Sequence, residues 1–199
     1  MKYFDDYVIK TPKTTEETRA AVLKYLKNKG EANRLDEVVE RVQRDWAVGL
    51  DIVKKGIIPN KMLGNLEFLD NEKIKQDRVN VLHDAWDDLY DAGKVDEMKL
   101  VADKSLDFIV ELWKYGVYEK TFKVGLEFGL MKGNIVLIDF GELCENRDAA
   151  KRRIKQKPWV AKMLRNSCKG VSDFYNKSAN EKLTLEAFNE NWGKYIWNF

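Results

Sequence analysis

Apolar residues recur at spacings of three and four along several long segments of the chain. This spacing places them on one face of a helix, so we expect amphipathic helices at residues 14–28, 31–55, 79–92 and 96–115. The first of them begins with Thr14 and Glu17, the two positions of a capping box. Glycine residues follow these segments where a helix would end. The pattern therefore predicts a mainly helical protein.

Shorter apolar runs near the N-terminus predict a small sheet. Residues 3–10 have the composition of a strand, and Pro12 ends it because proline cannot donate to a ladder. Further along, two short apolar pieces within residues 62–69 flank Gly64 and Asn65. A Gly-Asn pair between apolar pieces favours a tight hairpin. We expect this hairpin to complete a three-stranded sheet with the first strand.

One strand stands out in the second half of the chain. Residues 135–138 are apolar and mostly β-branched, and they lie between a Gly-Asn turn and Asp139. Such a strand is buried and presents the carboxylate at its C-terminal end. We therefore expect an α+β, mainly helical fold with a small antiparallel sheet lobe at residues 1–78 and a helical lobe at residues 79–199.

Composition narrows the class of protein. The chain has 199 residues, of which 44% are hydrophobic and 34% charged, as expected of a folded protein with a dense charged surface. Two cysteines, Cys144 and Cys168, are too few for a disulfide framework, so we expect a cytoplasmic location. No apolar run is long enough for a membrane helix. The net charge of +2 argues neither for nor against nucleic acid.

The strand that ends in Asp139, Phe140 and Gly141 resembles the metal-binding element of the protein-kinase-like fold. Lys10 follows Val8 and Ile9, an order similar to the strand of kinases that carries the phosphate-binding lysine. The elements expected directly before Asp139 are a long helix, a glycine, an irregular loop and a short hairpin. Their order is also that of the kinase C-terminal lobe. For an isolated match, the alternative is a solvated lysine on an edge strand.

This resemblance implies a nucleotide site. Lys10 would bind the phosphates of ATP, Asp139 would hold Mg²⁺, and Phe140 and Gly141 would flank the metal. Kinases pair the lysine with a glutamate on a helix, and here Glu31 is a better candidate than Glu37 because it lies closer to the apolar stripe. The alternative for both is an ordinary solvated helix surface.

The chain departs from the kinase pattern at two places. No Asp with an Asn five residues later stands between Gly116 and Asp139, so the usual catalytic loop is absent. Glu119 would have to replace the catalytic base, and Glu127 could serve as a second metal ligand because carboxylate oxygen suits magnesium. Both glutamates could equally be surface residues of a hairpin. We also expect no glycine-rich loop, because a loop of this kind needs two strands before Lys10 and only nine residues precede it in this sequence.

Two further segments suggest contacts with other molecules. The segment Lys151–Lys157 is strongly basic and could meet an acidic surface of a protein partner, or it is a solvated helix end. Aromatic residues are not interleaved with the basic ones, so we regard nucleic acid as an unfavoured partner. The C-terminal segment is rich in apolar residues, which would dock on the core or form an oligomer contact: Phe188, Trp192, Tyr195, Ile196, Trp197 and Phe199.

These observations support one leading hypothesis. The chain would be a divergent kinase-like protein that binds ATP and Mg²⁺, either a pseudokinase or an atypical phosphotransferase acting on a protein or small-molecule hydroxyl. The alternative is a non-catalytic helical adaptor with no nucleotide site. The relative position of Lys10 and Asp139 distinguishes the two, because only the first hypothesis requires them to share a groove.

Overall fold

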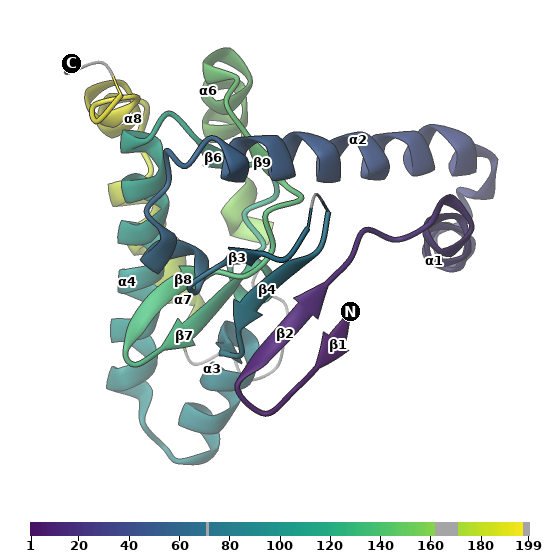
Figure 1. Cartoon of the computed structure of the whole chain (residues 1–199). Helices are drawn as coiled ribbons and strands as arrows, with labels where there is room; N and C mark the ends of the chain where they lie inside the picture. The colour runs from purple at the N-terminus through teal and green to yellow at the C-terminus, as the bar shows by residue number, and fades with distance from the viewer. Residues whose placement is uncertain (71, 162–170, 197–199) are drawn as a thin grey trace.

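The computed structural model describes residues 1–70, 72–161 and 171–196. Its N-terminal part contains an antiparallel sheet in the order β1-β2-β4-β3 (Figure 1). The strands are β1 (Lys2–Tyr3), β2 (Tyr7–Lys10), β3 (Glu67–Phe68) and β4 (Ile74–Asp77). Val8 and Lys10 of β2 are buried, whereas Tyr7 and Ile9 are only partly covered, so the alternation expected of a half-buried strand sets Lys10 inward.

Two smaller sheets follow. The first has the order β5-β7-β8 and the second pairs β6 with β9, all antiparallel. Their strands are β5 (Asn80–Val81), β6 (Tyr118–Glu119), β7 (Phe128–Met131), β8 (Asn134–Leu137) and β9 (Leu143–Cys144). The turn between β7 and β8 consists of Lys132 and Gly133, both with positive φ, as in the type I′ turns of two-residue hairpins. Strand β8 is the predicted buried strand that leads to Asp139.

Helices make up most of the chain, so the fold is α+β and mainly helical, as predicted. The helices are α1 (Thr15–Lys27), α2 (Leu35–Lys54), α3 (Leu82–Asp91), α4 (Val95–Lys114), α5 (Val124–Glu127), α6 (Arg147–Lys155), α7 (Ser172–Lys182) and α8 (Leu185–Asn191), with 3₁₀ turns η1 (Ala32–Arg34), η2 (Asn60–Leu63) and η3 (Pro158–Ala161). The Thr14 side chain accepts from the Glu17 amide and the Glu17 carboxylate accepts from the Thr14 amide. The predicted capping box is therefore confirmed.

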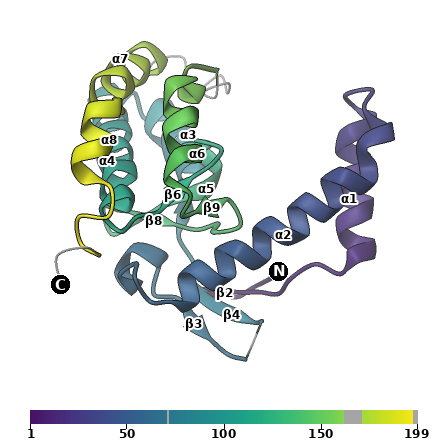
Figure 2. The same cartoon turned by 90° about the horizontal axis from the view of Figure 1, so that it is seen from above.

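Helices α1 and α2 form an arm that extends from the rest of the molecule (Figures 1 and 2). The arm has a small apolar cluster of its own, made of Val22, Leu26, Val38 and Val39. Towards its C-terminus α2 joins the main core through residues such as Ile52 and Val53. The end of the arm that lies far from the body is therefore held by contacts between α1 and α2. The C-terminal half of α2 is held by packing against the body of the protein.

The main core runs through both halves of the chain, from Leu50 in α2 to Phe188 in α8. The C-terminal segment docks on α4, because Phe188 stacks edge-on against Trp113 and Trp192 packs against this pair. Docking on the core, one of the two predicted alternatives, is thus confirmed for these residues. Trp197 and Phe199 lie outside the described residues.

The predicted hairpin around Gly64 and Asn65 is wrong. Residues 60–63 form the 3₁₀ turn η2, which buries Met62 and Leu63, and Gly64 ends it in the left-handed conformation with φ of 60°. The hairpin is formed by β3 and β4 instead. The first strand also differs from the prediction, since it is broken into β1 and β2, so the sheet has four strands and not three.

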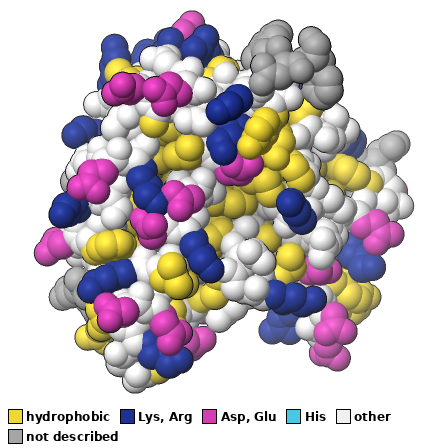
Figure 3. Space-filling view, turned by 90° about the vertical axis from the view of Figure 1, so that its left-hand side faces the viewer, with side chains coloured by type: hydrophobic (Ala, Val, Ile, Leu, Met, Phe, Trp, Pro, Cys, Tyr) yellow, Lys and Arg dark blue, Asp and Glu magenta, His cyan; other side chains and the backbone are white. Residues whose placement is uncertain are grey.

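The surface carries charges of both signs. Figure 3 shows the side of the molecule that includes α4, where hydrophobic side chains lie among lysines, arginines and acidic residues. Of the helices in the described part of the chain, none combines the length and the apolar character that crossing a membrane requires.

Candidate functional site

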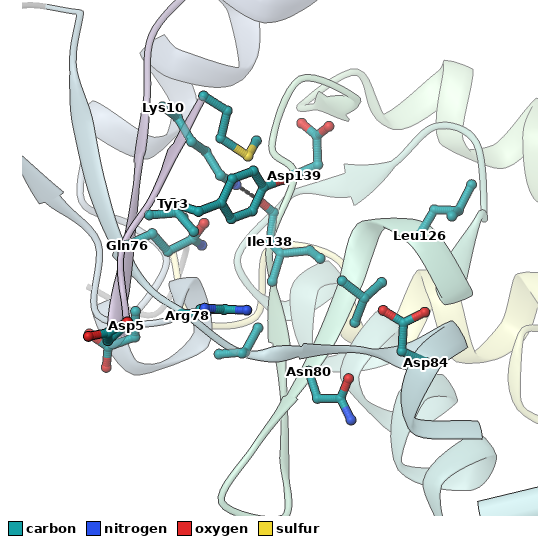
Figure 4. A pocket seen from close by; sticks show the side chains of 15 residues that line it. Tyr3, Asp5, Lys10, Gln76, Arg78, Asn80, Asp84, Leu126, Ile138 and Asp139 are labelled. Atoms are coloured by element: carbon teal, nitrogen blue, oxygen red, sulfur yellow. Dashed lines mark hydrogen bonds between the residues drawn. The ribbon is translucent and has the colours of Figure 1, made fainter. Parts of the chain in front are cut away.

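Lys10 and the segment that carries Asp139 meet between the first sheet and β8. The Lys10 amine donates a hydrogen bond to the carbonyl oxygen of Ile138, the residue directly before Asp139 (Figure 4). Only 7% of Lys10 is exposed. Burial lowers the pKa of the Lys10 amine, and the charges of Asp139 and Glu127 oppose this shift. The structure therefore brings together the two residues that sequence analysis paired across 128 intervening positions.

The backbone around Asp139 is fixed by its neighbours. The amides of Ile138 and Asp139 both donate to the carbonyl oxygen of Glu127, at 2.8 and 3.2 Å. The Gly141 amide donates to Asp139 Oδ1 at 3.0 Å. Asp139 is exposed although the strand before it is buried. The strand thus ends by presenting the carboxylate to solvent in a defined orientation.

Phe140 and Gly49 anchor this segment to α2. The Phe140 ring is fully buried and lies 4.8 Å from the Trp46 ring, centroid to centroid. Gly49 approaches the Phe140 carbonyl so closely that a β-carbon at this position would clash with it. The glycine is therefore required by close packing, because any side chain would push α2 away from the Asp-Phe-Gly segment.

Glu127 is the second carboxylate of the site. It ends α5, is 6% exposed and lines the same cavity as Asp139. Burial, together with the negative charge of Asp139, raises the pKa of Glu127 to about 8. The exposed carboxylate of Asp139 and the buried carboxylate of Glu127 thus lie beside one lysine, Lys10. A cation placed between them would relieve their repulsion, so the pair suits a divalent metal ion.

The described residues contain no group of three or more His, Cys, Asp or Glu side chains placed to hold a metal. This does not conflict with magnesium, which often binds to one or two carboxylates and takes its remaining ligands from substrate phosphates and water. Asp139 and Glu127 fit that pattern.

Two cavities adjoin the Lys10 and Asp139 pair, which lines both of them. The first hollow, about 690 Å³, lies between the first sheet and the β5, β8 and α3 region (Figure 4). Its lining includes apolar side chains: Val8, Val79, Val81, Leu126 and Ile138. The second hollow, about 490 Å³, lies between the arm and the body. Its further lining residues include Thr18, Gln43, Asp45, Trp46, Lys123, Glu127 and Glu142.

Glu119 does not face either hollow. It is 3% exposed, and its carboxylate accepts hydrogen bonds from the amides of Thr121 and Phe122 and from the Thr121 hydroxyl. Burial raises the pKa of Glu119 to about 7. The side chain therefore braces its own loop. The structure does not place it as the catalytic base that sequence analysis expected, because the tight turn after β6 folds the loop amides onto the carboxylate.

Glu31 is not brought to Lys10. It lies at the turn between α1 and α2, and its carboxylate pairs with Arg34 at 2.8 Å. Glu37 pairs with the same guanidinium at 3.1 Å. The reason is the helical hairpin, which carries this turn to the distal end of the arm (Figure 2). The carboxylates that influence Lys10 are those of Asp139 and Glu127.

Sequence analysis missed several residues of the site. Lys120 bridges the arm and the body by pairing with Asp45 at 2.7 Å and with Glu142 at 3.7 Å. Gln76 lines the first hollow from β4. Nothing in the local pattern marks these side chains, because their partners come from other elements. The position of Glu142 directly after Asp-Phe-Gly was the one available signal.

The basic segment Lys151–Lys157 spans the end of α6 and the residues after it. Arg153 donates to the carbonyl of Lys120 at 3.0 Å, so this arginine is used within the molecule. Arg152, Lys155 and Lys157 are exposed. A contact with an acidic partner stays a prediction.

The comparisons with known proteins add no family to this picture. The chain matches no protein-family model, no curated protein and no solved structure.

Proposed function

We propose that the protein binds ATP and Mg²⁺ in the cleft at Lys10 and Asp139 and is an atypical phosphotransferase related to the kinase-like proteins. The observation that carries this proposal is the contact between the Lys10 amine and the carbonyl of Ile138 beside Asp139, with cavities on both sides. A buried amine and an exposed carboxylate at one cleft are what a nucleotide phosphate and its metal ion require.

The order of elements supports the same proposal. The long helix α4 ends before Gly116, an irregular loop and the β7–β8 hairpin follow, and the chain then reaches Asp139, Phe140 and Gly141. This is the order that the resemblance to kinases implies. It is supported by packing, since α2 lies against Phe140 through Trp46 and Gly49.

Each residue has a defined task in this proposal. Lys10 holds the phosphates, and Asp139 and Glu127 hold Mg²⁺, which when bound neutralises charge on the phosphate oxygens. The first hollow takes the nucleoside, because its lining includes apolar side chains from β2, from β5 and from the residue after β8. The second hollow takes the acceptor, a hydroxyl of a protein or small molecule, since it opens on the other side of the same pair.

A second candidate is a nucleotide-binding protein that transfers no phosphoryl group. The observation that favours it is the position of Glu119, whose carboxylate is occupied by its own loop. Phosphoryl transfer depends mainly on positioning and charge stabilisation, so the absence of a base lowers the rate without preventing transfer. The adaptor alternative predicts Lys10 far from Asp139, and the observed contact gives it no support.

Binding is tested by thermal unfolding with Mg²⁺ and ATP. We expect the pair of ligands to raise the melting temperature of the wild-type protein, because a ligand that binds only the folded state stabilises it. Asp139→Ala should remove this shift. Asp91→Ala is the matched control, since Asp91 is exposed and lines neither hollow. If the wild-type protein shows no shift at millimolar ligand, the proposal is wrong.

Transfer is tested separately with ATP labelled at the γ-phosphate. A phosphotransferase should label itself or an added hydroxyl acceptor, and Asp139→Asn should abolish the label with the fold intact. Nucleotide binding without any label, in the presence of protein and small-molecule acceptors, would favour the second candidate.

A further inference from the structure

Gln76 has an amide group with a fixed orientation. It lies on β4, opposite Val8, and is 2% exposed. Its Nε2 donates to the carbonyl oxygens of Leu63 and Leu137, at 2.7 and 2.9 Å. Carbonyl oxygens can only accept, so the nitrogen of the amide must face them. A flipped amide would place an oxygen against two oxygens and lose both hydrogen bonds.

The surrounding backbone helps to hold this orientation. Gly64 lies so close that an added β-carbon would meet Gln76 Cγ at 3.3 Å and Nε2 at 3.4 Å. Gly64 also has a positive φ of 60°, which favours glycine there. The turn after η2 therefore packs tightly against the side chain. Leu63 and Leu137 come from η2 and β8, so Gln76 joins three elements.

The oxygen of the amide, Oε1, has no protein partner among the residues that the structure describes. Within the described residues, no hydrogen bond to Gln76 Oε1 is found, and this atom is not among the polar atoms sealed from solvent. Gln76 lines the first hollow. Figure 4 shows its side chain pointing from the strand towards the region between Lys10 and Ile138. The hollow thus contains a fixed hydrogen-bond acceptor on an otherwise buried residue.

We propose that Gln76 is the residue that determines base specificity in the first hollow, by accepting a hydrogen bond from an exocyclic amino group of the nucleobase. This inference rests on the proposed function, because it assumes that the first hollow binds a nucleoside. Among purine nucleotides it selects a 6-amino base, as in ATP, against a 6-oxo base, as in inosine or guanosine triphosphate.

The physical reason is the polarity of the fixed amide. A 6-amino group can donate to Gln76 Oε1, whereas a 6-oxo group would place oxygen against oxygen. The amide cannot adapt by flipping without leaving the carbonyls of Leu63 and Leu137 unpaired, and buried polar groups without partners are costly. Sites built to hydrogen-bond one group reject analogues that lack it more strongly than apolar pockets do.

The test measures the dissociation constants of ATP, purine riboside triphosphate and inosine triphosphate in the presence of Mg²⁺. In the wild-type protein, we expect ATP to bind about tenfold more tightly than inosine triphosphate. Purine riboside triphosphate lacks the 6-substituent, so it should fall between the two. This comparison uses only the unmodified protein and does not depend on the folding of a variant.

A pair of variants then assigns the preference to the residue. Gln76→Met removes the acceptor, and we expect the ratio of the two dissociation constants to approach one. Gln156→Met makes the same replacement at the exposed C-terminal end of α6, outside both hollows, and should leave the ratio unchanged.

The outcomes separate this inference from the proposed function. Equal binding of ATP and inosine triphosphate by the wild-type protein would overturn the role of Gln76 and leave nucleotide binding intact. An unchanged ratio in a folded Gln76→Met variant would do the same. If none of the three triphosphates binds, both the proposed function and this inference are wrong.

Discussion

At the scale of single residues, the site holds ionisable groups whose pKa values are shifted towards neutrality. Burial lowers the pKa of Lys10, and burial together with Asp139 raises the pKa of Glu127 to about 8. The charged forms of both groups lose hydration in the cleft. Perturbed titration of this kind is common where residues bind or transfer charged groups, so it agrees with the proposed site.

Glu127 makes stability depend on pH. Its pKa is about 8 in the folded protein and near 4.3 in an unfolded chain, so unfolding releases a proton between these values. Stability should therefore fall as pH rises through this window. Glu127→Gln removes the effect, so the stability of this variant relative to the wild-type protein should increase by on the order of 3 kcal/mol between pH 5.5 and pH 9. Chemical denaturation at pH 5.5 and 9 measures the difference.

Glu190→Gln is the control for this experiment, because Glu190 is exposed on α8. Its stability should follow that of the wild-type protein at both pH values. If the stability of Glu127→Gln relative to the wild-type protein did not increase between pH 5.5 and pH 9, Glu127 would be ionised in the folded protein at both pH values.

At the scale of elements, the packing of α2 on the Asp-Phe-Gly segment holds the site in place. The contact is made by Trp46 and Gly49 on the helix and by Phe140 on the segment. Asp139 is the residue before Phe140, so any displacement of the phenylalanine moves the carboxylate. The helix therefore fixes the position of Asp139, the proposed metal ligand, through a contact that leaves no space for a side chain at Gly49.

Gly49→Ala tests this control. The added methyl group would overlap the Phe140 carbonyl, and overpacking of this kind costs about 1–3 kcal/mol. We expect a lower melting temperature and weaker binding of Mg²⁺ and ATP, as measured by thermal unfolding and calorimetry. Val48→Ala alters the neighbouring residue, which is 41% exposed, and should change neither. If Gly49→Ala had the stability and the ligand affinity of the wild-type protein, a glycine would not be required for the packing of α2 on Phe140.

At the scale of the whole molecule, the arm and the body have separate apolar clusters. The arm cluster is small, whereas the body cluster extends from α2 to α8. The two are linked by the continuous helix α2 and by Lys120, which pairs with Asp45 on one side and Glu142 on the other. Because the arm cluster contains only four buried apolar residues, we expect the arm to open locally without unfolding the body.

Leu26→Ala tests whether the arm can open while the body stays folded. Leu26 is buried in the arm cluster, and truncation of a buried leucine costs about 2–5 kcal/mol. We expect hydrogen exchange to speed up in α1 while α4 keeps its protection. Loss of protection in α4 to the same extent would mean that arm and body unfold as one unit.

The sequence predicted those parts of the site that depend on local pattern. The buried run of β8 before Asp139 and the capping box at Thr14 are both set by neighbouring residues, and both are found. Lys10 was identified by its place at the end of a strand. The resemblance to kinases implied that Lys10 and Asp139 share a groove, but the hydrogen bond of Lys10 to Ile138 follows from tertiary packing that no local pattern could establish.

Errors arose where tertiary structure decides. Glu119 and Glu127 have similar local surroundings, yet one braces a loop and the other faces the second hollow. Gly64 and Asn65 predict a hairpin, whereas the structure has a 3₁₀ turn before them that buries Met62 and Leu63. The fixed amide of Gln76 depends on carbonyls that lie 13 and 61 positions away in the chain. Such contacts leave no trace in a local pattern.

The most direct test of the central claim is a crystal structure with a non-hydrolysable ATP analogue and Mn²⁺, whose anomalous signal locates the metal. We expect the triphosphate beside the Lys10 amine, the metal on the carboxylates of Asp139 and Glu127, and the base in the first hollow. Well-ordered crystals grown at saturating ligand that show neither analogue nor metal in this cleft, or that show both at another place, would contradict the account.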